Sequence, residues 1–196
     1  MSGEGKVSIA VASSAIASQL LLGGTTAHRR FSIPLSINEH STCKFSEKTN
    51  SGKTIKLASV IIWDEAPMQS RWSIEAVNRS LQYLMNKPDV PFGGKLMVFG
   101  GDFRQVLPVL PKASRGTIVS MIMKNSHLWK EMKILHLKIN ERVNRSGNSA
   151  DAQAYAKYLM NIGEGTLPQY DTLGSSVVRV AKLLLHQNQN IEDFVC

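Results

Sequence analysis

The chain has 196 residues, of which 43% are hydrophobic and 19% are charged, and its formal net charge is +8. These values are typical of a globular chain with one domain or slightly more, long enough to bury a hydrophobic core. The basic surplus lies in the first 150 residues, which hold 20 Lys and Arg against 10 Asp and Glu, and it favours a polyanionic partner.

The sequence predicts neither a transmembrane helix nor a secretory leader. The longest apolar stretch, residues 15–22, is far short of the roughly 20 apolar residues that cross a bilayer. Residues 1–6 lack the features of a signal peptide, so we expect an intracellular protein. Cys43 and Cys196 have no spacing typical of zinc sites or disulfide frameworks, and we interpret them as structural or incidental thiols.

A strand followed by a helix is predicted near the start of the chain. Residues 7–12 form a β-branched run, and the serines that follow it, Ser13 and Ser14, can cap a helix. This helix is predicted to reach Leu22 and to end at the glycine pair at 23–24.

Further strands are predicted at 58–63 and 95–100. Both runs are apolar without alternation, which is typical of strands covered on both faces in a parallel sheet. A helix that reaches Leu84 separates them, and a shorter strand at 133–137 and a helix at 150–162 follow. Strands that alternate with helices predict an open α/β fold whose ligand site lies at the carboxyl ends of the strands.

Asp64 and Glu65 directly follow the apolar strand at 58–63. Nucleoside triphosphatases place two carboxylates beside a phosphate in this way: the first holds Mg²⁺, usually through water, and the second polarises the attacking water. The alternative is a strand whose last residues merely enter a solvated turn.

The strand at 95–100 ends in a similar pattern, with the glycines at 100–101 followed by Asp102 and, three residues later, Gln105. A glutamine at this place could contact a γ-phosphate by hydrogen bonding and transmit that contact to other parts of the protein. A glycine turn with exposed polar residues is the alternative.

Four ordered segments of the sequence resemble Pif-type ATP-dependent DNA helicases, which are superfamily-one, RecD-like motors that translocate 5′ to 3′. The segments are residues 11–17, 24–34, 62–68 and 99–109. The resemblance implies an α/β fold, namely a RecA-like P-loop NTPase domain with a mainly parallel sheet that is truncated at its N-terminus. Residues 1–162 would be a partial first motor domain, and residues 163–196 would lead toward a missing second motor domain.

The resemblance also implies roles for matching residues in the nucleotide site. Asp64 would associate with magnesium, Glu65 would activate water, and Gln105 would contact the γ-phosphate of ATP. Arg142 would stabilise charge on the transferred phosphate. The family usually has Met where this chain has Glu141, whose carboxylate could pair with Arg142, and a surface arginine is the alternative for this residue.

Further matching residues are implied to lie along single-stranded DNA: Ser13, Ser14, Thr26, His28 and Arg29. Hydroxyl groups can bind phosphate oxygens, and the rings of His28 and Phe31 offer faces for base stacking. Helix capping by Ser13, a core position for Phe31 and a satisfied histidine at position 28 are the alternatives.

A helicase of this class needs a glycine-rich phosphate loop, and none precedes residue 7. The segment Ser51-Gly52-Lys53-Thr54 has Glu47 where such a loop requires glycine, and we interpret it as a surface turn. We therefore expect a fragment of an ATP-dependent 5′-to-3′ DNA helicase of DNA repair, recombination and telomere maintenance that is inactive alone.

Two other functions stay open. One is a non-catalytic single-stranded DNA-binding module derived from a helicase, and the other is an unrelated α/β nucleotide hydrolase. The expected ligands and partners are ATP, Mg²⁺ and single-stranded DNA. The chain is expected to be a monomer without a membrane partner, and the resemblance implies the nucleus or the mitochondrion as its location.

Overall fold

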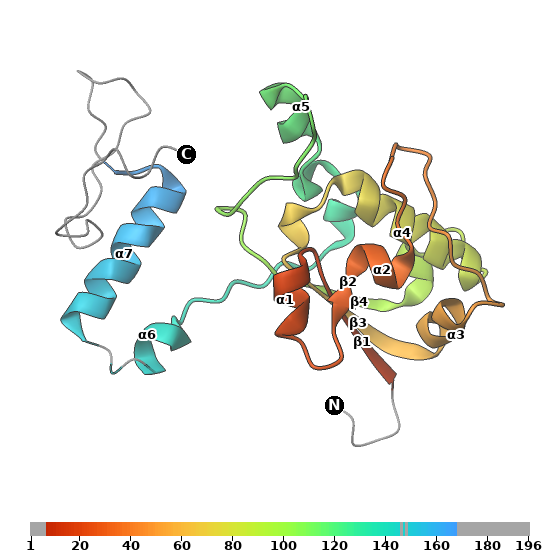
Figure 1. The fold of residues 1–196 in the computed structure, drawn as a ribbon, viewed down its shortest axis with the longest axis horizontal. Coiled ribbons are helices and arrows are strands. Elements are labelled where there is room, and N and C mark those ends of the chain that lie inside the picture. Colours follow the sequence, from red (N-terminus) through yellow and green to blue (C-terminus); the bar gives the residue numbers. More distant parts are fainter. Residues whose placement is uncertain (1–6, 146, 148, 168–196) are drawn as a thin grey trace. The chain divides into compact units, whose positions relative to one another are not determined.

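The computed structural model describes residues 7–145, 147 and 149–167, and the chain divides into two compact units, residues 1–135 and 136–196 (Figure 1). In these described ranges, no helix has both the length and the apolar character needed to cross a membrane.

A parallel sheet with the strand order β2-β1-β3-β4 lies at the centre of the first unit. The strands are β1 (Val7–Ala12), β2 (Thr25–Thr26), β3 (Ala58–Asp64) and β4 (Leu96–Phe99). The sheet confirms the prediction of an α/β fold with a mainly parallel sheet.

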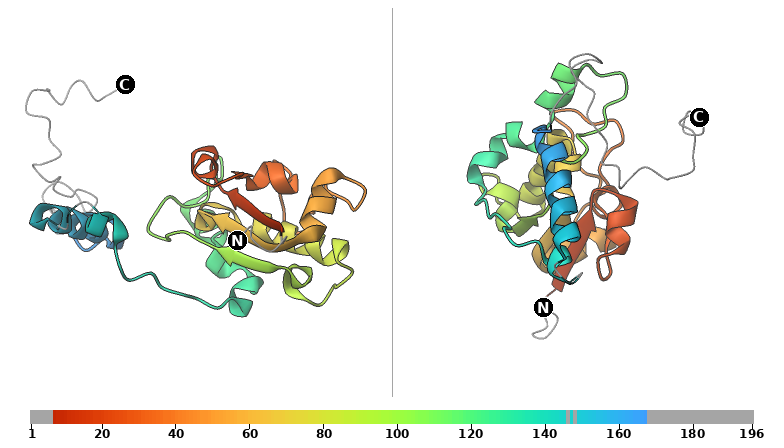
Figure 2. Two further views of the ribbon diagram at one scale, coloured as in Figure 1. Left: turned by 90° about the horizontal axis from the view of Figure 1, so that it is seen from below. Right: turned by 90° about the vertical axis from the view of Figure 1, so that its left-hand side faces the viewer.

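Five α-helices of the first unit connect or flank these strands (Figures 1 and 2). They are α1 (Ala15–Gln19), α2 (Ala27–Phe31), α3 (Asn50–Leu57), α4 (Arg71–Leu84) and α5 (Arg115–Ser120). Each begins after a serine or threonine whose side chain accepts a backbone N–H of the first turn, and this cap satisfies a donor that the helix itself leaves unpaired. Short 3₁₀ helices are η1 (Ala66–Met68), η2 (Pro91–Gly94), η3 (Met123–Asn125) and η4 (His127–Glu131).

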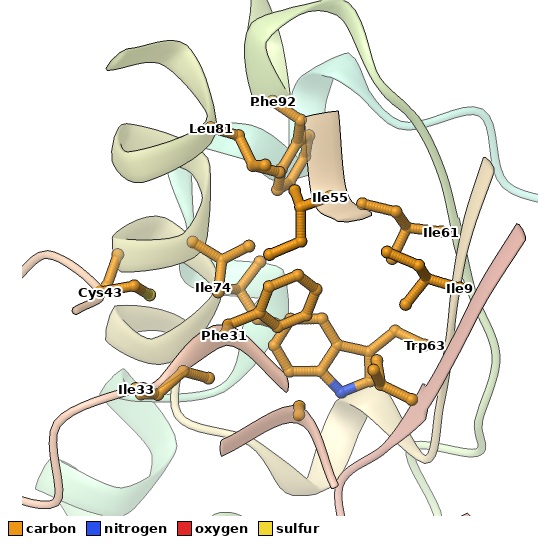
Figure 3. Packing of buried hydrophobic residues seen from close by; sticks show 14 of the residues in the cluster. Ile9, Phe31, Ile33, Cys43, Ile55, Ile61, Trp63, Ile74, Leu81 and Phe92 are labelled. Carbon is orange, nitrogen blue, oxygen red and sulfur yellow. The ribbon is translucent and has the colours of Figure 1, made fainter. Parts of the chain in front are cut away.

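The hydrophobic core lies on one face of the sheet. Because side chains alternate along a strand and Ile9 is in register with Ile61, these residues and Trp63 point to the same face. There they pack against Phe31 of α2 and against the apolar stripe of α4 (Figure 3). Ile61, Trp63 and Phe31 are fully buried, so this cluster supplies much of the hydrophobic stabilisation of the unit.

The other face of the sheet is less completely covered. Leu96 and Val98 of β4 are 61% and 46% exposed, so the prediction that this strand is covered on both faces is wrong. β4 is an edge strand, and it lines a groove of about 540 Å³ together with residues 131–135. The apolar run correctly indicated a strand, but composition alone could not show that this strand lies at an edge.

The predicted strand at 133–137 is absent, because residues 132–140 have no regular secondary structure. A short run with apolar residues forms a strand only where a neighbouring strand supplies hydrogen-bond partners. Among the described residues, no strand pairs with this segment.

The first helix is shorter than predicted and ends at Gln19 instead of Leu22. Leu20 and Leu22 are exposed, so a longer helix would gain no burial, and short helices depend on packing for their stability. Gly24 then brings the chain back against α1, where a Cβ would overlap with the carbonyl oxygen of Ser18. The glycine at this position is required by that close approach.

The segment Ser51-Gly52-Lys53-Thr54 lies in the first turns of α3, so its interpretation as a surface turn is wrong. The Thr49 hydroxyl accepts the N–H of Gly52 at 3.0 Å, and Ser51 Oγ donates to the carbonyl oxygen of Arg30 at 2.7 Å. Gly52 is buried where a Cβ would overlap with the Ser46 carbonyl group. Close packing therefore explains this glycine without a phosphate ligand.

The second unit contains α6 (Glu141–Arg145) and α7 (Ala150–Glu164). Ser149 caps α7, and the left-handed Gly165 ends it, which confirms the predicted helix at 150–162. The predicted division at 162/163 falls within α7 and stays a prediction. Residues 168–196 of the predicted connecting segment lie outside the described residues.

Candidate active site and single-strand interface

The carboxyl ends of the strands are aligned at one edge of the sheet, which we call the carboxyl edge. Ala12 is in register with both Thr26 and Asp64, and Trp63 is in register with Phe99. The turns that leave these strands carry further predicted site residues, namely Ser13, Ser14 and Glu65. The structure thus brings the two carboxylates and several of the predicted DNA-binding residues to the same edge of the sheet. The alternation of strands and helices predicted this arrangement.

The turn after β3 holds Asp64 and Glu65 in a defined geometry. The N–H of Glu65 donates to Asp64 Oδ1 at 2.9 Å, and the carbonyl oxygen of Glu65 accepts the N–H of Met68 at 3.1 Å. Glu65 has a left-handed backbone, with φ 51° and ψ 35°. Such strain in a residue other than glycine is found preferentially at functional sites, where surrounding contacts maintain it.

The turn after β4 is bonded to the turn after β3. The N–H of Gly100 donates to the Trp63 carbonyl at 2.9 Å, and the N–H of Ala66 donates to the Gly100 carbonyl at 3.0 Å. Gly101 has φ 150°, and a Cβ at this position would overlap with the ring of Pro67. Glycine at position 101 is therefore required for the close approach of the two turns.

Asp102 orders the segment that leads to Gln105. Asp102 Oδ1 accepts the backbone N–H of Arg104 at 2.9 Å and its Nε–H at 3.1 Å. These hydrogen bonds and the guanidinium charge hold the pKa of Asp102 below its ordinary value. The N–H of Gln105 donates to the Asp102 carbonyl at 3.3 Å, while its side chain is exposed. The backbone at Gln105 is thus fixed, and its amide group is accessible to a ligand.

The hydroxyl oxygens of the predicted residues Ser13, Ser14 and Thr26 each accept a hydrogen bond from within the protein. Ser14 Oγ accepts the N–H of Ala17 at 3.1 Å, and Thr26 Oγ1 accepts the N–H of Arg29 at 3.3 Å. Ser13 Oγ instead accepts the indole N–H of Trp63 at 3.1 Å, so the helix-capping interpretation of Ser13 is wrong. A hydroxyl that accepts in this way still has its own proton to donate to a phosphate oxygen.

The predicted residues of α2 have different environments. Arg29 is exposed and His28 is half-buried. Phe31 is fully buried, with its ring stacked on Trp63 at a centroid distance of 5.6 Å and an interplanar angle of 29°. Base stacking by Phe31 is therefore excluded in this fold, and its core alternative is confirmed.

Acidification is expected to destabilise the chain through His28. Burial lowers the pKa of His28 below its ordinary value of about 6.5. As the pH falls through 6.5, the unfolded chain takes up a proton at this histidine before the folded chain does, so the free energy of unfolding decreases. Urea denaturation between pH 7.5 and 5 should show this decrease, and His28→Gln should remove a part of it. Equal pH dependence in both proteins would contradict the expectation.

Arg142 lies in the second unit, exposed on α6 beside Glu141. Its contribution to the nucleotide site stays a prediction.

Two site residues carried no recognised signal in the sequence. Trp63 reaches Ser13 across 50 positions of the chain, and Gln69 Nε2 donates to the Ser13 carbonyl at 3.4 Å. A tryptophan at the end of an apolar strand and a glutamine after a proline turn do not indicate such contacts by themselves. The one available signal was that both residues lie close to the Asp64-Glu65 pair in the sequence.

Cys43 is unsuited to metal or redox chemistry in the folded chain. It is buried, and burial raises the pKa of its thiol to about 11. Because the thiolate is the reactive form, this cysteine is inert at neutral pH, in agreement with its structural interpretation.

The carboxyl edge is chemically suited to a magnesium–nucleotide complex. Mg²⁺ in such complexes takes only one or two carboxylates and completes its shell with water and phosphate oxygens. Asp64 and Glu65 offer adjacent carboxylates, and Glu65 Oε2 is buried without a hydrogen-bond partner in the described part of the chain. In the part of the chain that the structure describes, no group of three or more His, Cys, Asp or Glu could form a protein cage for a metal. The residues therefore fit an ion held mainly by nucleotide and water.

The parallel sheet with polar turns at its carboxyl edge defines a RecA-like α/β domain. The chain belongs to the family described as PIF1-like helicase, whose model matches residues 1–172. This match confirms the resemblance found in the sequence.

A curated relative is a Pif1 helicase, in agreement with the family match. The chain is 28% identical over 142 residues to the ATP-dependent DNA helicase Pif1 of Psychrobacter sp. (strain PRwf-1), a match that covers 71% of this chain and 21% of that protein. It thus spans about a fifth of the length of this curated relative.

Solved Pif1 helicases have a similar fold. The Bacteroides enzyme in complex with ADP-AlF3 and ssDNA superposes with a TM-score of 0.61 at 23% identity, covering 85% of this chain and 38% of that chain. Pif1 from Candida albicans gives a TM-score of 0.58 at 24% identity, covering 84% of this chain and 35% of that chain. At these sequence identities, the structural similarity shows a shared fold.

Proposed function

We propose that the chain is a piece of the first motor domain of an ATP-dependent 5′-to-3′ DNA helicase acting in DNA repair, recombination and telomere maintenance. It supplies a single-stranded DNA surface and the carboxylates for ATP hydrolysis, but it is inactive as an ATPase on its own. Family membership supports this proposal, and so does the Bacteroides Pif1 structure, which was solved with ssDNA and ADP-AlF3.

The single observation that carries the proposal is the register of the sheet. Ala12 lies opposite both Thr26 and Asp64, so the hydroxyl residues after β1 and at β2 share the carboxyl edge with the carboxylates after β3. A motor needs its DNA contacts and its hydrolytic groups on one rigid scaffold. The sheet provides that scaffold.

The DNA surface consists of hydroxyl donors beside a basic and an aromatic side chain. The protons of Ser13, Ser14 and Thr26 can be donated to phosphate oxygens, and exposed Arg29 adds a positive charge. His28 is neutral near pH 7 because burial lowers its pKa, so it would contribute a stacking face more than a charge. These contacts do not read base identity, as suits a translocating protein.

In the nucleotide site, Asp64 would hold Mg²⁺ through water, and the magnesium would neutralise phosphate charge when bound. Glu65 would accept a proton from the attacking water, since no donor among the described residues competes for its Oε2. The exposed amide of Gln105 would contact the γ-phosphate. The strained turn at Glu65 holds its carboxylate in place for this task.

The position of Ser51-Gly52-Lys53-Thr54 supports the proposed inactivity of the isolated chain. This segment lies in α3, which leads into the amino end of β3, whereas Asp64 lies at the carboxyl end of the same strand. A seven-residue strand spans about 20 Å, so Lys53 cannot cradle a phosphate beside Asp64. The 196 residues contain no other glycine-rich phosphate loop.

The same observation favours a second candidate, a non-catalytic single-stranded DNA-binding module. A module of this kind would keep the hydroxyl and basic contacts without using the carboxylates. Binding of Mn²⁺, a paramagnetic substitute for Mg²⁺, separates the two candidates. The helicase proposal expects Mn²⁺ to broaden the NMR signal of the Glu65 amide, and it expects Asp64→Asn to weaken this effect.

ATP hydrolysis and DNA binding by the 196-residue chain test the proposal together. We expect salt-sensitive binding of oligo-dT and an ATP turnover no greater than that of Glu65→Gln. Turnover that Glu65→Gln abolishes would overturn the inactivity of the chain, and a lack of oligo-dT binding would overturn the DNA surface. DNA binding without any Mn²⁺ effect at Glu65 would favour the non-catalytic module.

A further inference from the structure

Ser13 and Trp63 connect the proposed DNA surface to the carboxylates through a short series of direct contacts. The indole N–H of Trp63 donates to Ser13 Oγ at 3.1 Å, and the backbone N–H of Ser13 donates to the Asp64 carbonyl at 3.0 Å. Gln69 Nε2 donates to the Ser13 carbonyl at 3.4 Å. Ser13 is thus bonded on three sides to the segment that surrounds the acid pair.

Trp63 also has little freedom to move independently of its neighbours. It is fully buried, and its ring lies beside the ring of Phe31 in α2 (Figure 3), at a centroid distance of 5.6 Å. The ring of Phe99 in β4 lies 6.0 Å away. Its carbonyl accepts the N–H of Gly100, the first residue of the turn after β4. Closely packed interiors transmit strain, so a shift of Ser13 would move the indole and the turns bonded to it.

We propose that the Trp63–Ser13 hydrogen bond transmits single-stranded DNA binding at Ser13 to the carboxylates at Asp64 and Glu65, which makes Trp63 a positioning residue. This inference rests on the proposed function, because it requires DNA at the carboxyl edge. A phosphate that accepts the Ser13 proton strengthens the acceptor character of the same oxygen toward the indole, since hydrogen bonds in series polarise one another. The main-chain bond from Ser13 to Asp64 makes the acid turn respond to the same event.

The backbone amides of Arg29, Glu65 and Gly101 report on the two ends of this path in NMR spectra. Oligo-dT of about 15 nucleotides is added to the 196-residue chain. In the unmodified protein, all three amides are expected to shift, together with the indole N–H of Trp63. In Trp63→Phe, which keeps an aromatic ring but loses the N–H, Arg29 should shift as before. The shift of Gly101, whose turn is bonded to Trp63, should fall by about fivefold or more, and the shift of Glu65 should fall less, because the main-chain bond from Ser13 to Asp64 is retained.

Two further variants make the test specific. Trp129→Phe removes an indole that stacks edge-on against Phe103, outside the path, and should leave all shifts unchanged. Ser13→Ala removes both the acceptor of the indole N–H and the proposed donor to phosphate, so on its own it should lower the shifts of Glu65 and Gly101 at least as much as Trp63→Phe does.

The outcomes distinguish this inference from the proposed function. Unchanged shifts at Glu65 and Gly101 in Trp63→Phe would overturn the inference while Arg29 still reports DNA binding. The same conclusion holds if these two amides fail to respond in the unmodified protein. If oligo-dT shifts no amide at all, the proposed DNA surface is wrong and the inference is overturned with it.

Discussion

Trp63→Ala is expected to lower the free energy of unfolding of the chain by about 3–5 kcal/mol, the range typical of a buried aromatic residue replaced by alanine. The indole is fully buried between the rings of Phe31 and Phe99, and few other side chains in the first unit have its volume. Its removal would leave a cavity and an unpaired Ser13 hydroxyl. Urea denaturation followed by circular dichroism measures the loss.

Trp63→Phe is the matched control for this change. Phenylalanine retains an aromatic ring against Phe31 and Phe99 and loses only the outer part of the indole with its N–H. We expect a loss of about 1–2 kcal/mol, from the missing volume and one hydrogen bond. Equal losses for the alanine and phenylalanine variants would show that ring packing does not dominate at this site.

Gly101→Ala is expected to destabilise the chain by about 1–3 kcal/mol and to displace the turn at Glu65. The new Cβ would overlap with the ring of Pro67, and the backbone at φ 150° disfavours a side chain. Because Ala66 is bonded to Gly100, relief of the overlap must move the acid turn. The amide signal of Glu65 should therefore shift along with the loss of stability.

Gly116→Ala is the control for Gly101→Ala. Gly116 lies in α5, and its nearest neighbour to a new Cβ is Ser114 Oγ at 3.9 Å. Alanine should fit there without strain and stabilise the helix by up to about 1 kcal/mol. A Gly101→Ala protein as stable as Gly116→Ala would contradict the account of the two turns.

The sequence was sufficient to predict the sheet and the place of the acid pair. The uninterrupted apolar run before Asp64 indicates a strand in a parallel sheet, and carboxyl ends of parallel strands share an edge. The register of Ala12 with Asp64 and with Thr26 confirms this reasoning. The left-handed backbone of Glu65 was not predictable from the local sequence, because the residues that follow it, Ala66 and Pro67, contact the turn after β4.

Residue roles that depend on distant partners were harder to predict. Ser13 and Ser14 are equivalent in the sequence, yet Ser14 caps α1 while Ser13 contacts Trp63 across 50 positions. Phe31 follows a basic segment, and only the fold shows that its ring lies in the core. Local pattern fixes which element a residue occupies, but tertiary packing decides what its side chain touches.

Errors in the predicted elements arose where a strand or helix lacked a partner. Residues 133–137 include the apolar residues Ile134, Leu135 and Leu137, but no strand pairs with them among the described residues. Leu20 and Leu22 favour a longer α1, but neither finds apolar surface to contact. In both segments, the local propensity for a strand or a helix was insufficient to form that element without strand pairing or burial of side chains.

The central claim is that the carboxyl edge binds single-stranded DNA, and the salt dependence of oligo-dT affinity in two charge variants tests it most directly. Arg29→Ala removes an exposed charge beside Thr26, whereas Lys53→Ala removes an exposed charge from α3, at the amino end of β3. Fluorescence anisotropy over a range of salt concentrations gives the affinity and its slope. We predict that Arg29→Ala weakens binding and reduces the slope by about 0.7, as for one lost phosphate contact, while Lys53→Ala changes neither. Equal effects of the two variants, or a larger effect of Lys53→Ala, would contradict the claim.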